Sequence, residues 1–162
     1  MSVLRPFKAT DMFKFNNINL DIWTETYGIG FYLSYLSRWP DLCCVQESPN
    51  GQMMGYVLGK AEGAGVEWHG HVTAITVAPE YRRLGLARKM MNLLELVSDE
   101  LYKGFFVDLY EGERVLWEFG EWEGGRDDED AFDMRKPLSR DPNRISVRPN
   151  GRDVIVSAQD VS

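Results

Sequence analysis

The chain has 162 residues, which is enough for one domain with a single hydrophobic core and too few for a second full domain. A hydrophobic fraction of 44% is typical of a globular protein and excludes a disordered or fibrous one. The net charge of -7 predicts no general attraction to nucleic acid. No stretch has the apolar length of a signal peptide or a membrane span, so we expect a cytoplasmic protein without direct contact to membrane or nucleic acid.

The N-terminal part of the sequence predicts a strand followed by two short helices. A strand is expected from Ser2 to Phe7. Thr10 and Asp11 can cap a helix that runs to Ile18, although three asparagines interrupt its apolar pattern. A second helix is expected from about Gly28 to Arg38, with its aromatic residues on one face.

The middle of the chain predicts a meander that leads into a strand-helix-strand crossover. Asn50-Gly51 is a strong hairpin signal between the first two strands of this part. The expected strands cover residues 42–46, 52–60, 71–77 and 105–110, and a helix at 85–101 joins the last two. A crossover of this kind makes its two strands parallel. The fold class is therefore α/β of the α+β type, with a mostly antiparallel twisted sheet, one parallel step and flanking helices.

The two cysteines, Cys43 and Cys44, are adjacent within an apolar run. Their spacing fits neither a metal site nor a disulfide framework. We expect buried, reduced thiols, as suits a reducing cytosol, and we predict no metal.

The segment between the 71–77 strand and the following helix carries the chemistry. Gly85 lets a ligand approach the backbone closely, and a helix that begins there presents unpaired N–H groups and its positive dipole end. This arrangement suits a diphosphate. Further positive charge comes from Arg82, Arg83, Arg88 and Lys89. The alternative is an arginine-rich loop that is simply solvated.

Within this segment, residues 82–87 match the Arg/Gln-x-x-Gly-x-Gly/Ala loop, and the chain resembles the GNAT acetyltransferases. The resemblance implies that acetyl-CoA is the cosubstrate and that an amine attacks its thioester directly, without a cysteine nucleophile. It also implies a set of cofactor-binding residues, namely Arg82, Arg83, Leu84, Gly85, Leu86 and Ala87 in the loop and Ile75, Thr76 and Val77 in the preceding strand.

Other segments resemble the catalytic subunits of the NatB protein N-terminal acetyltransferases. They occur in family order at residues 15–21, 24–28, 67–74, 104–109 and 128–136. That family acetylates the α-amino group of nascent polypeptides whose initiator Met is followed by Asp, Glu, Asn or Gln. It works with a large auxiliary subunit, through which it associates with the ribosome, and the resemblance implies that the first helix faces this subunit.

The same resemblance implies the substrate-binding residues. Glu25, Tyr27 and Gly28 are expected on the loop that holds the peptide N-terminus, with His71 and Thr73 on the strand beneath it. His71 is also a candidate for catalysis, as a neutral imidazole or as a donor to the second residue of the peptide. Without the family, Glu25, His69 and His71 would be taken for ordinary solvated or satisfied residues.

The family pattern fails after Tyr110. Nine of the twenty residues from Glu111 to Asp130 are acidic, and a segment of roughly 15 to 20 family residues is absent. That segment forms a helix beside the pantetheine arm and supplies a tyrosine near the sulfur, for which Tyr110 is the remaining catalytic candidate. A gene-model or splicing error and a natural short paralogue are both open origins. Functionally, a defective variant that only binds the auxiliary subunit is the alternative to an enzyme.

The domain expectation follows from the same pattern. Residues 1–136 form an acetyltransferase domain that is incomplete around 110–126. Residues 137–162 are polar and are expected to be an extended or disordered tail.

Overall fold

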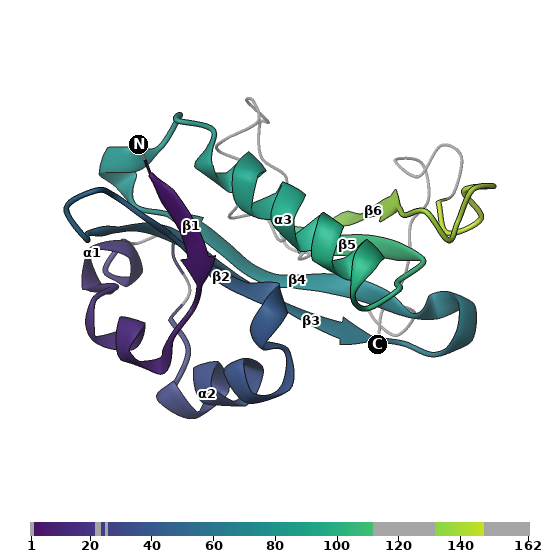
Figure 1. Ribbon diagram of the computed structural model, residues 1–162, viewed down its shortest axis with the longest axis horizontal. Coiled ribbons are helices and arrows are strands. Elements are labelled where there is room, and N and C mark those ends of the chain that lie inside the picture. The colour runs from purple at the N-terminus through teal and green to yellow at the C-terminus, as the bar shows by residue number, and fades with distance from the viewer. Residues whose placement is uncertain (1, 22–23, 25, 112–131, 148–162) are drawn as a thin grey trace, which may run out of the picture.

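The computed structural model describes residues 2–21, 24, 26–111 and 132–147. This part of the chain forms a six-stranded sheet in which the strands follow one another in chain order (Figure 1). The strands are β1 (Val3–Pro6), β2 (Cys43–Glu47), β3 (Met53–Glu62), β4 (His69–Val77), β5 (Phe106–Glu111) and β6 (Phe132–Pro137). Neighbouring strands are antiparallel except for β4 and β5, which are parallel. The predicted fold class is confirmed.

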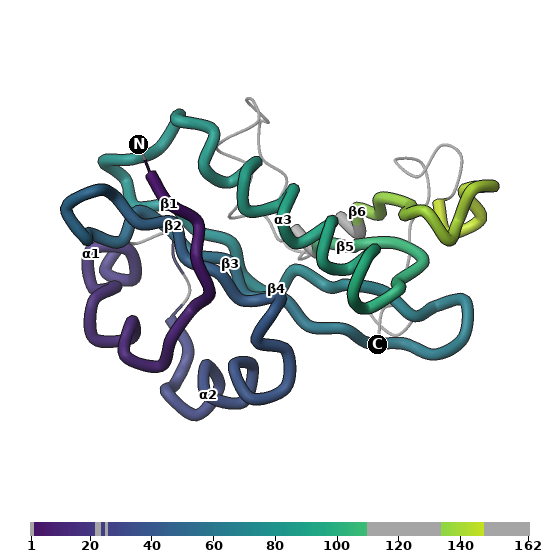
Figure 2. Tube along the Cα trace, viewed as in Figure 1, coloured from purple at the N-terminus to yellow at the C-terminus, as the bar shows by residue number. Residues whose placement is uncertain are grey.

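Helices cover both faces of the sheet (Figure 1, Figure 2). The α-helices are α1 (Asn16–Asn19), α2 (Ile29–Arg38) and α3 (Leu86–Glu100). The described 3₁₀ turns are η1 (Ala9–Phe13), η2 (Pro40–Leu42), η3 (Gly65–Glu67) and η4 (Pro79–Tyr81). One hydrophobic core lies under α1 and α2 and contains Tyr32 and Tyr56, and a second lies under α3 and contains Met90 and Leu94. None of the described helices is long and apolar enough to cross a membrane.

The first predicted helix is wrong as a single element, because the chain breaks it into η1 and α1. Asparagines are poor helix formers, and two of them use their side chains elsewhere. Asn17 donates to the Met53 carbonyl at 3.2 Å, and the Asn19 carbonyl accepts from the Tyr56 hydroxyl at 3.0 Å. These bonds fasten the short helix to the first half of β3.

The helix α3 packs against β4 at Gly70, which has no side chain. A Cβ atom on Gly70 would lie 2.2 Å from Ser98 Oγ. The absence of that Cβ therefore lets the backbone of β4 and the helix approach closely.

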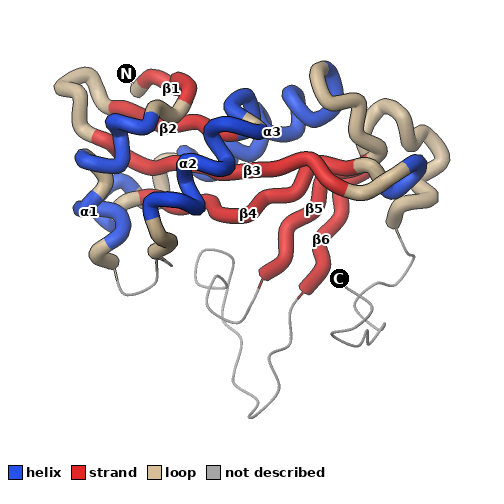
Figure 3. The backbone as a smooth tube through the Cα atoms, turned by 90° about the horizontal axis from the view of Figure 1, so that it is seen from below, coloured by secondary structure: helices blue, strands red, loops and turns tan. Residues whose placement is uncertain are grey.

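The sheet opens between β4 and β5. Within the described residues the parallel pairing joins only residues 69–72 of β4 to residues 106–109 of β5, although β4 continues to Val77. A β-bulge adds to the divergence, because Leu58 of β3 pairs with Ala74 while Gly59 pairs with Val72, which leaves Thr73 unpaired. Figure 3 shows β5 and β6 turning away from β4. This opening positions the candidate site.

The first part of the expected tail is folded into turns that the structure describes. Leu138 packs against the core under α3, and Arg140 lies 4.3 Å from the centre of the Phe105 ring. The buried Asp141 carboxylate accepts the N–H groups of Ile145 and Ser146 at 2.8 and 2.9 Å. Residues 148–162 lie outside the described part.

The prediction that both cysteines are buried is confirmed. Cys43 and Cys44 are 1% and 3% exposed, and both are free thiols. Burial raises the pKa of Cys43 to about 11 and that of Cys44 to about 12, so neither thiol is an activated nucleophile.

Candidate functional site

The turn that precedes α3 has the backbone geometry of an anion site. Arg83 and Gly85 have φ angles of 65° and 72°, in the left-handed region that L-residues seldom adopt. A Cβ on Gly85 would have no atom within 4 Å, so glycine is favoured here by the positive φ angle and not by a lack of space. No side-chain cap covers the N-cap residue Gly85 among the described residues. The first N–H groups of α3 thus remain available for a bound anion.

The side chains of this turn divide into two groups. Arg82 bonds to the carboxylate of Asp21 and donates through Nε to the Val77 carbonyl at 3.3 Å, so its guanidinium fastens the turn. The side chain of Leu86 is buried and anchors the helix start. The exposed members of the turn and first helical turn, which can reach a phosphate or the edge of a nucleotide, are Arg83, Leu84, Arg88 and Lys89, with Ala87 half-buried.

Among the described residues, the end of β4 has no strand partner on one of its two sides. Ile75 and Thr76 are half-buried and Val77 is 7% exposed, and all three pair with β3 on one side. Their other edge lies beyond the last described pair with β5. An extended ligand can therefore hydrogen-bond to this edge in the manner of an added strand.

The loop between α1 and α2 is tied to that same edge. Thr24 Oγ1 lies 3.1 Å from Thr76 Oγ1, and Asp21 holds Arg82 of the anion-binding turn. Tyr27 stacks on the ring of Phe31 with centroids 4.3 Å apart, and Gly28 is the N-cap residue of α2. Glu25 lies outside the described residues, so its predicted role stays a prediction.

His71 and Thr73 lie on β4 on the face that α2 covers. Thr73 Oγ1 is 3.0 Å from the Tyr35 hydroxyl, and His71 Nδ1 is 2.8 Å from Asp108 Oδ1. The Asp108 carboxylate can only accept, so Nδ1 of His71 is the donor. Burial raises the pKa of Asp108, but its contacts with His69 and His71 outweigh burial and lower the pKa to about 2.

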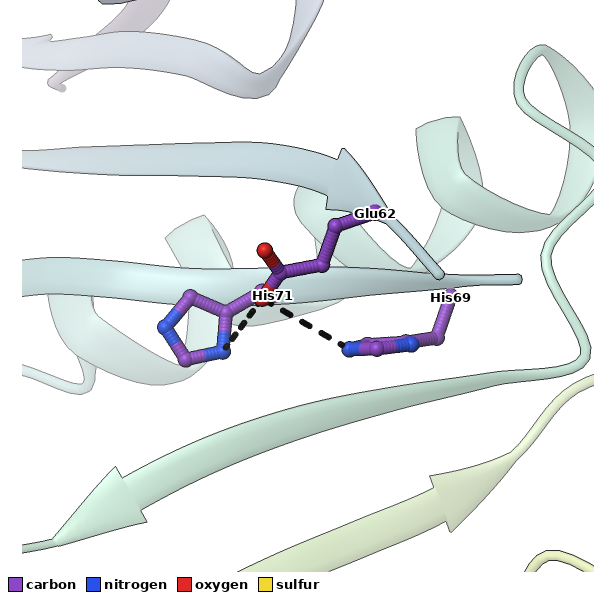
Figure 4. Close-up of side chains that lie close together, drawn as sticks. All are labelled: Glu62, His69 and His71. Atoms are coloured by element: carbon purple, nitrogen blue, oxygen red, sulfur yellow. Dashed lines mark ion pairs between the residues drawn. The ribbon is translucent and has the colours of Figure 1, made fainter. Parts of the chain in front are cut away.

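Sequence reasoning missed Asp108 and Glu62. The parallel register places Asp108 beside His71, and the β3–β4 hairpin places Glu62 opposite His69 (Figure 4). His69 Nε2 lies 3.3 Å from Asp108 Oδ2 and 3.9 Å from Glu62 Oε1. Among the described residues, Glu62, His69 and His71 form a group whose ligand atoms lie within 4.8 Å of one another. Only the strand register could have revealed this group, because the four residues span 47 positions.

Comparison with known proteins identifies the family. The family model for GNAT acetyltransferases matches residues 12–108. The chain belongs to the GNAT acetyltransferase family. Among curated relatives, it is 54% identical to the N-terminal acetyltransferase B complex catalytic subunit naa20 of Schizosaccharomyces pombe, with 100% of this chain and 99% of that protein covered. The chain is thus a homologue of the NatB catalytic subunits, which are acetyl-CoA-dependent N-terminal acetyltransferases.

Solved structures agree with this placement of the GNAT chain. It superposes with a TM-score of 0.80 on Chaetomium thermophilum Naa20 in complex with a bisubstrate analogue, at 35% identity, covering 92% of this chain and 93% of that one. A NatB acetyltransferase complex bound to a bisubstrate inhibitor gives a TM-score of 0.71 at 37% identity, covering 94% and 99%. The predicted GNAT fold and NatB resemblance are confirmed.

The fission yeast alignment also measures what this GNAT chain lacks. It has 182 positions and contains all 162 residues, so the chain has no residue at 20 of the positions. The number of these positions is close to the roughly 15 to 20 residues expected to be absent, and their location after Tyr110 stays a prediction. Tyr110 belongs to β5, and its backbone pairs with Asp133 of β6, but its side chain lies outside the described part. Its catalytic role stays a prediction.

Proposed function

We propose that this chain transfers the acetyl group of acetyl-CoA to the α-amino group of proteins that begin with Met-Asp, Met-Glu, Met-Asn or Met-Gln. One observation carries the proposal. The open edge of β4 adjoins both the uncapped start of α3 and the face that holds His71 and Thr73. A cofactor laid along that edge can therefore meet a peptide amine held over that face.

The cofactor would lie across two elements of this chain. The diphosphate takes the free N–H groups at the start of α3, with Arg83 beside them. The pantetheine arm pairs with residues 75–77 of β4, and a main-chain N–H of that edge binds the thioester oxygen as negative charge develops. Arg82 acts indirectly, because its guanidinium is held by Asp21.

The reaction needs no covalent enzyme intermediate. An α-amino group has a pKa of about 7.7–8.0, so an appreciable fraction is neutral near pH 7. Its nitrogen bonds to the acetyl carbon, the thiolate of CoA leaves, and the surplus proton passes to solvent. Both cysteines are buried with raised pKa values, in keeping with direct attack.

Recognition of the second peptide residue would fall to His71. Asp108 holds Nδ1, and the other ring nitrogen lies on the far side of the ring from Glu62 and His69 (Figure 4). That nitrogen can donate to a side-chain oxygen of Asp, Glu, Asn or Gln when it carries a proton. Tyr27 and Gly28 would hold the initiator Met from the opposite side.

An auxiliary subunit would cover the exposed apolar residues on the α1–α2 side. Phe13 and Leu20 are 83% and 81% exposed, and Ile29 and Leu33 of α2 add to this surface. Exposed apolar residues gathered in this way are typical of a protein interface. We infer that a large auxiliary subunit binds here and brings the chain to ribosomes and nascent polypeptides in the cytoplasm.

The test is acetyl transfer from labelled acetyl-CoA by the chain together with its auxiliary subunit. A Met-Asp peptide should be acetylated, whereas a Met-Lys peptide of the same length should not. The fission yeast relative serves as the positive control in the same assay. If the relative labels the Met-Asp peptide and this chain does not, the proposed activity is excluded.

The 20 alignment positions without a residue favour a second candidate function, a non-catalytic subunit. Such a chain would bind the auxiliary subunit but not acetyl-CoA. Calorimetry separates the two candidates, because an enzyme binds both ligands and the non-catalytic subunit binds only the protein.

A further inference from the structure

Four metal-binding side chains gather on one face of the sheet. Glu62 and both histidines of the chain form the group whose ligand atoms lie within 4.8 Å of one another, and Asp108 contacts both histidines. Val72 and Val107 belong to the core under α3, and side chains alternate along strands, so His71 and Asp108 face the other way. Glu62 pairs with His69 across the hairpin, and Asp108 pairs with His71 across the parallel step. Three neighbouring strands therefore contribute to one cluster, which we call the Glu62–Asp108 cluster.

Two buried atoms of the cluster lack a hydrogen-bond partner. His69 Nδ1 lies 2.6 Å from the Glu67 carbonyl oxygen, which can only accept, so Nδ1 carries the proton. In the neutral ring Nε2 then presents a lone pair to the Asp108 and Glu62 carboxylates. Within the described part of the chain, His69 Nε2 and Asp108 Oδ2 are buried without a hydrogen bond, and Asp108 is 1% exposed. These two atoms lie 3.3 Å apart, and lone pairs that converge in this way call for a cation, which is either a proton on Nε2 or a metal ion.

The spacing of the donor atoms fits zinc. In a tetrahedral site with bonds of about 2.0–2.1 Å, neighbouring ligand atoms lie roughly 3.3 Å apart. Asp108 Oδ1 lies 2.8 Å from His71 Nδ1, and the other oxygen of the same carboxylate, Oδ2, lies 3.3 Å from His69 Nε2. Glu62 Oε1 lies 3.9 Å from His69 Nε2 and 4.0 Å from His71 Nδ1. These four contacts, between 2.8 and 4.0 Å, lie on either side of the required spacing, and zinc binding would require a rotation of the Asp108 carboxylate that brings one oxygen close to both histidines.

We propose that Glu62, His69, His71 and Asp108 bind one zinc ion. Two imidazoles and two carboxylates are a donor set that zinc accepts, and two negative charges balance the ion. This proposal replaces the expectation of no metal, which rested on the cysteines and on sequence spacing. Four protein ligands leave no open position, so the site is structural, and its occupancy does not depend on acetyl transfer.

The positive side chains around the cluster leave the metal position open. Lys60 pairs with Oε2 of Glu62, so Oε1 is the oxygen that faces the histidines. Arg135 lies 3.5 Å from the exposed Glu67 and over the ring of Phe106, on which His69 stacks. The competing occupant is a proton on His69, whose pKa is lowered by burial but raised overall by Asp108 and the Glu67 carbonyl. His71 must release its Nδ1 proton when zinc binds.

The experiment uses the full chain without a histidine tag, treated with a chelator and then titrated with zinc chloride at pH 7.5. Calorimetry should give one ion per chain. Because the chain has two histidines, their ring ¹⁵N signals can be followed individually, and both should change together up to one equivalent. Cobalt(II) in place of zinc should give the visible absorption of a tetrahedral site.

Two substitutions and one control define the ligands. Glu62→Gln and Asp108→Asn should each weaken zinc binding by about tenfold or more. Glu62 has a side chain that is 38% exposed, so its variant is expected to fold even if Asp108→Asn does not. Glu67→Gln removes an adjacent exposed carboxylate and should leave the affinity unchanged.

Three results would overturn the proposal. The first is an equal zinc affinity of Glu62→Gln and the unmodified chain. The second is a set of ¹⁵N signals in which His69 stays doubly protonated at one equivalent of zinc. The third is an intense near-ultraviolet cobalt–thiolate band, which would make Cys43 and Cys44 the ligands. None of these results bears on whether the chain acetylates peptides, so failure here and failure of the proposed function are distinguishable.

Discussion

The buried residue Asp108 makes the stability of the folded chain depend on pH. Its pKa in the folded chain is about 2, below the value of about 3.9 expected in the unfolded chain. A carboxyl whose folded pKa is depressed contributes stability above its unfolded pKa and loses it as the pH falls through the folded one. The chain should therefore lose about 2 kcal/mol of this contribution between roughly pH 5 and pH 2.

The substitution Asp108→Asn tests this prediction. The variant should be less stable than the unmodified chain at pH 7 by about 1–3 kcal/mol, because His71 loses a charged acceptor. The difference should shrink toward pH 2, where the unmodified carboxyl is also protonated. Urea unfolding at steps of half a pH unit gives both curves, and curves that stay parallel down to pH 2 would contradict the prediction.

Gly85 carries the second prediction at the scale of a residue. Its φ angle of 72° is strained for any residue with a Cβ, while the space around it is open. Gly85→Ala should cost about 1 kcal/mol in stability and weaken acetyl-CoA binding about tenfold or more, because the backbone can no longer hold the turn or admit the diphosphate. Calorimetry with acetyl-CoA and thermal unfolding measure the two effects.

The matched control is Gly30→Ala in α2. Gly30 also has no atom within 4 Å of an added Cβ, and its backbone is helical. Alanine there should stabilise the chain by up to about 1 kcal/mol and leave acetyl-CoA binding unchanged. If both alanine variants weaken acetyl-CoA binding equally, the turn at Gly85 is not the anion site.

At the scale of elements, periodicity in the sequence predicted the long helix and strands β1 to β5 to within one or two residues, but it did not predict β6. The α3 region was expected at 85–101 and is observed at Leu86–Glu100, because buried residues there recur at helical spacing. The prediction of a single first helix was wrong because its asparagines bond to β3, a tertiary contact that no local pattern contains. The Glu62–Asp108 cluster was not predicted for the same reason, because it depends on strand register.

The packing of α3 on the sheet gives a prediction at this scale. Leu94 is 2% exposed and belongs to the core between the helix and the sheet. Leu94→Ala should destabilise the chain by about 2–5 kcal/mol, because it leaves a cavity. Leu96 lies two residues further along the same helix and is 58% exposed, so Leu96→Ala should change the free energy of unfolding by less than about 0.5 kcal/mol. Denaturant unfolding compares them, and similar losses would contradict this assignment of faces.

For the whole molecule, the sheet brings the two proposed binding surfaces to one opening. The turn proposed to bind the diphosphate lies at the end of β4, and the face proposed to hold the peptide lies on the α2 side of the same strand. Asp21 and Thr24 tie the peptide loop to the cofactor edge, so the two surfaces are positioned together. The described far wall of the opening is β5, and the sequence departs from the family pattern after that strand.

Restoring the absent residues tests how far that wall limits catalysis. The resemblance implies that the family segment after β5 forms a helix beside the pantetheine arm, so we expect its absence to leave the thioester wetter and less well positioned. A chain in which the fission yeast sequence replaces the region between Glu111 and Phe132 should acetylate a Met-Asp peptide about 10- to 100-fold faster in kcat/KM. The control replaces the same region with a glycine-serine segment of equal length, which adds residues without a helix and should give no gain. An equal rate for all three chains would mean that β4 and α3 alone set the rate of transfer.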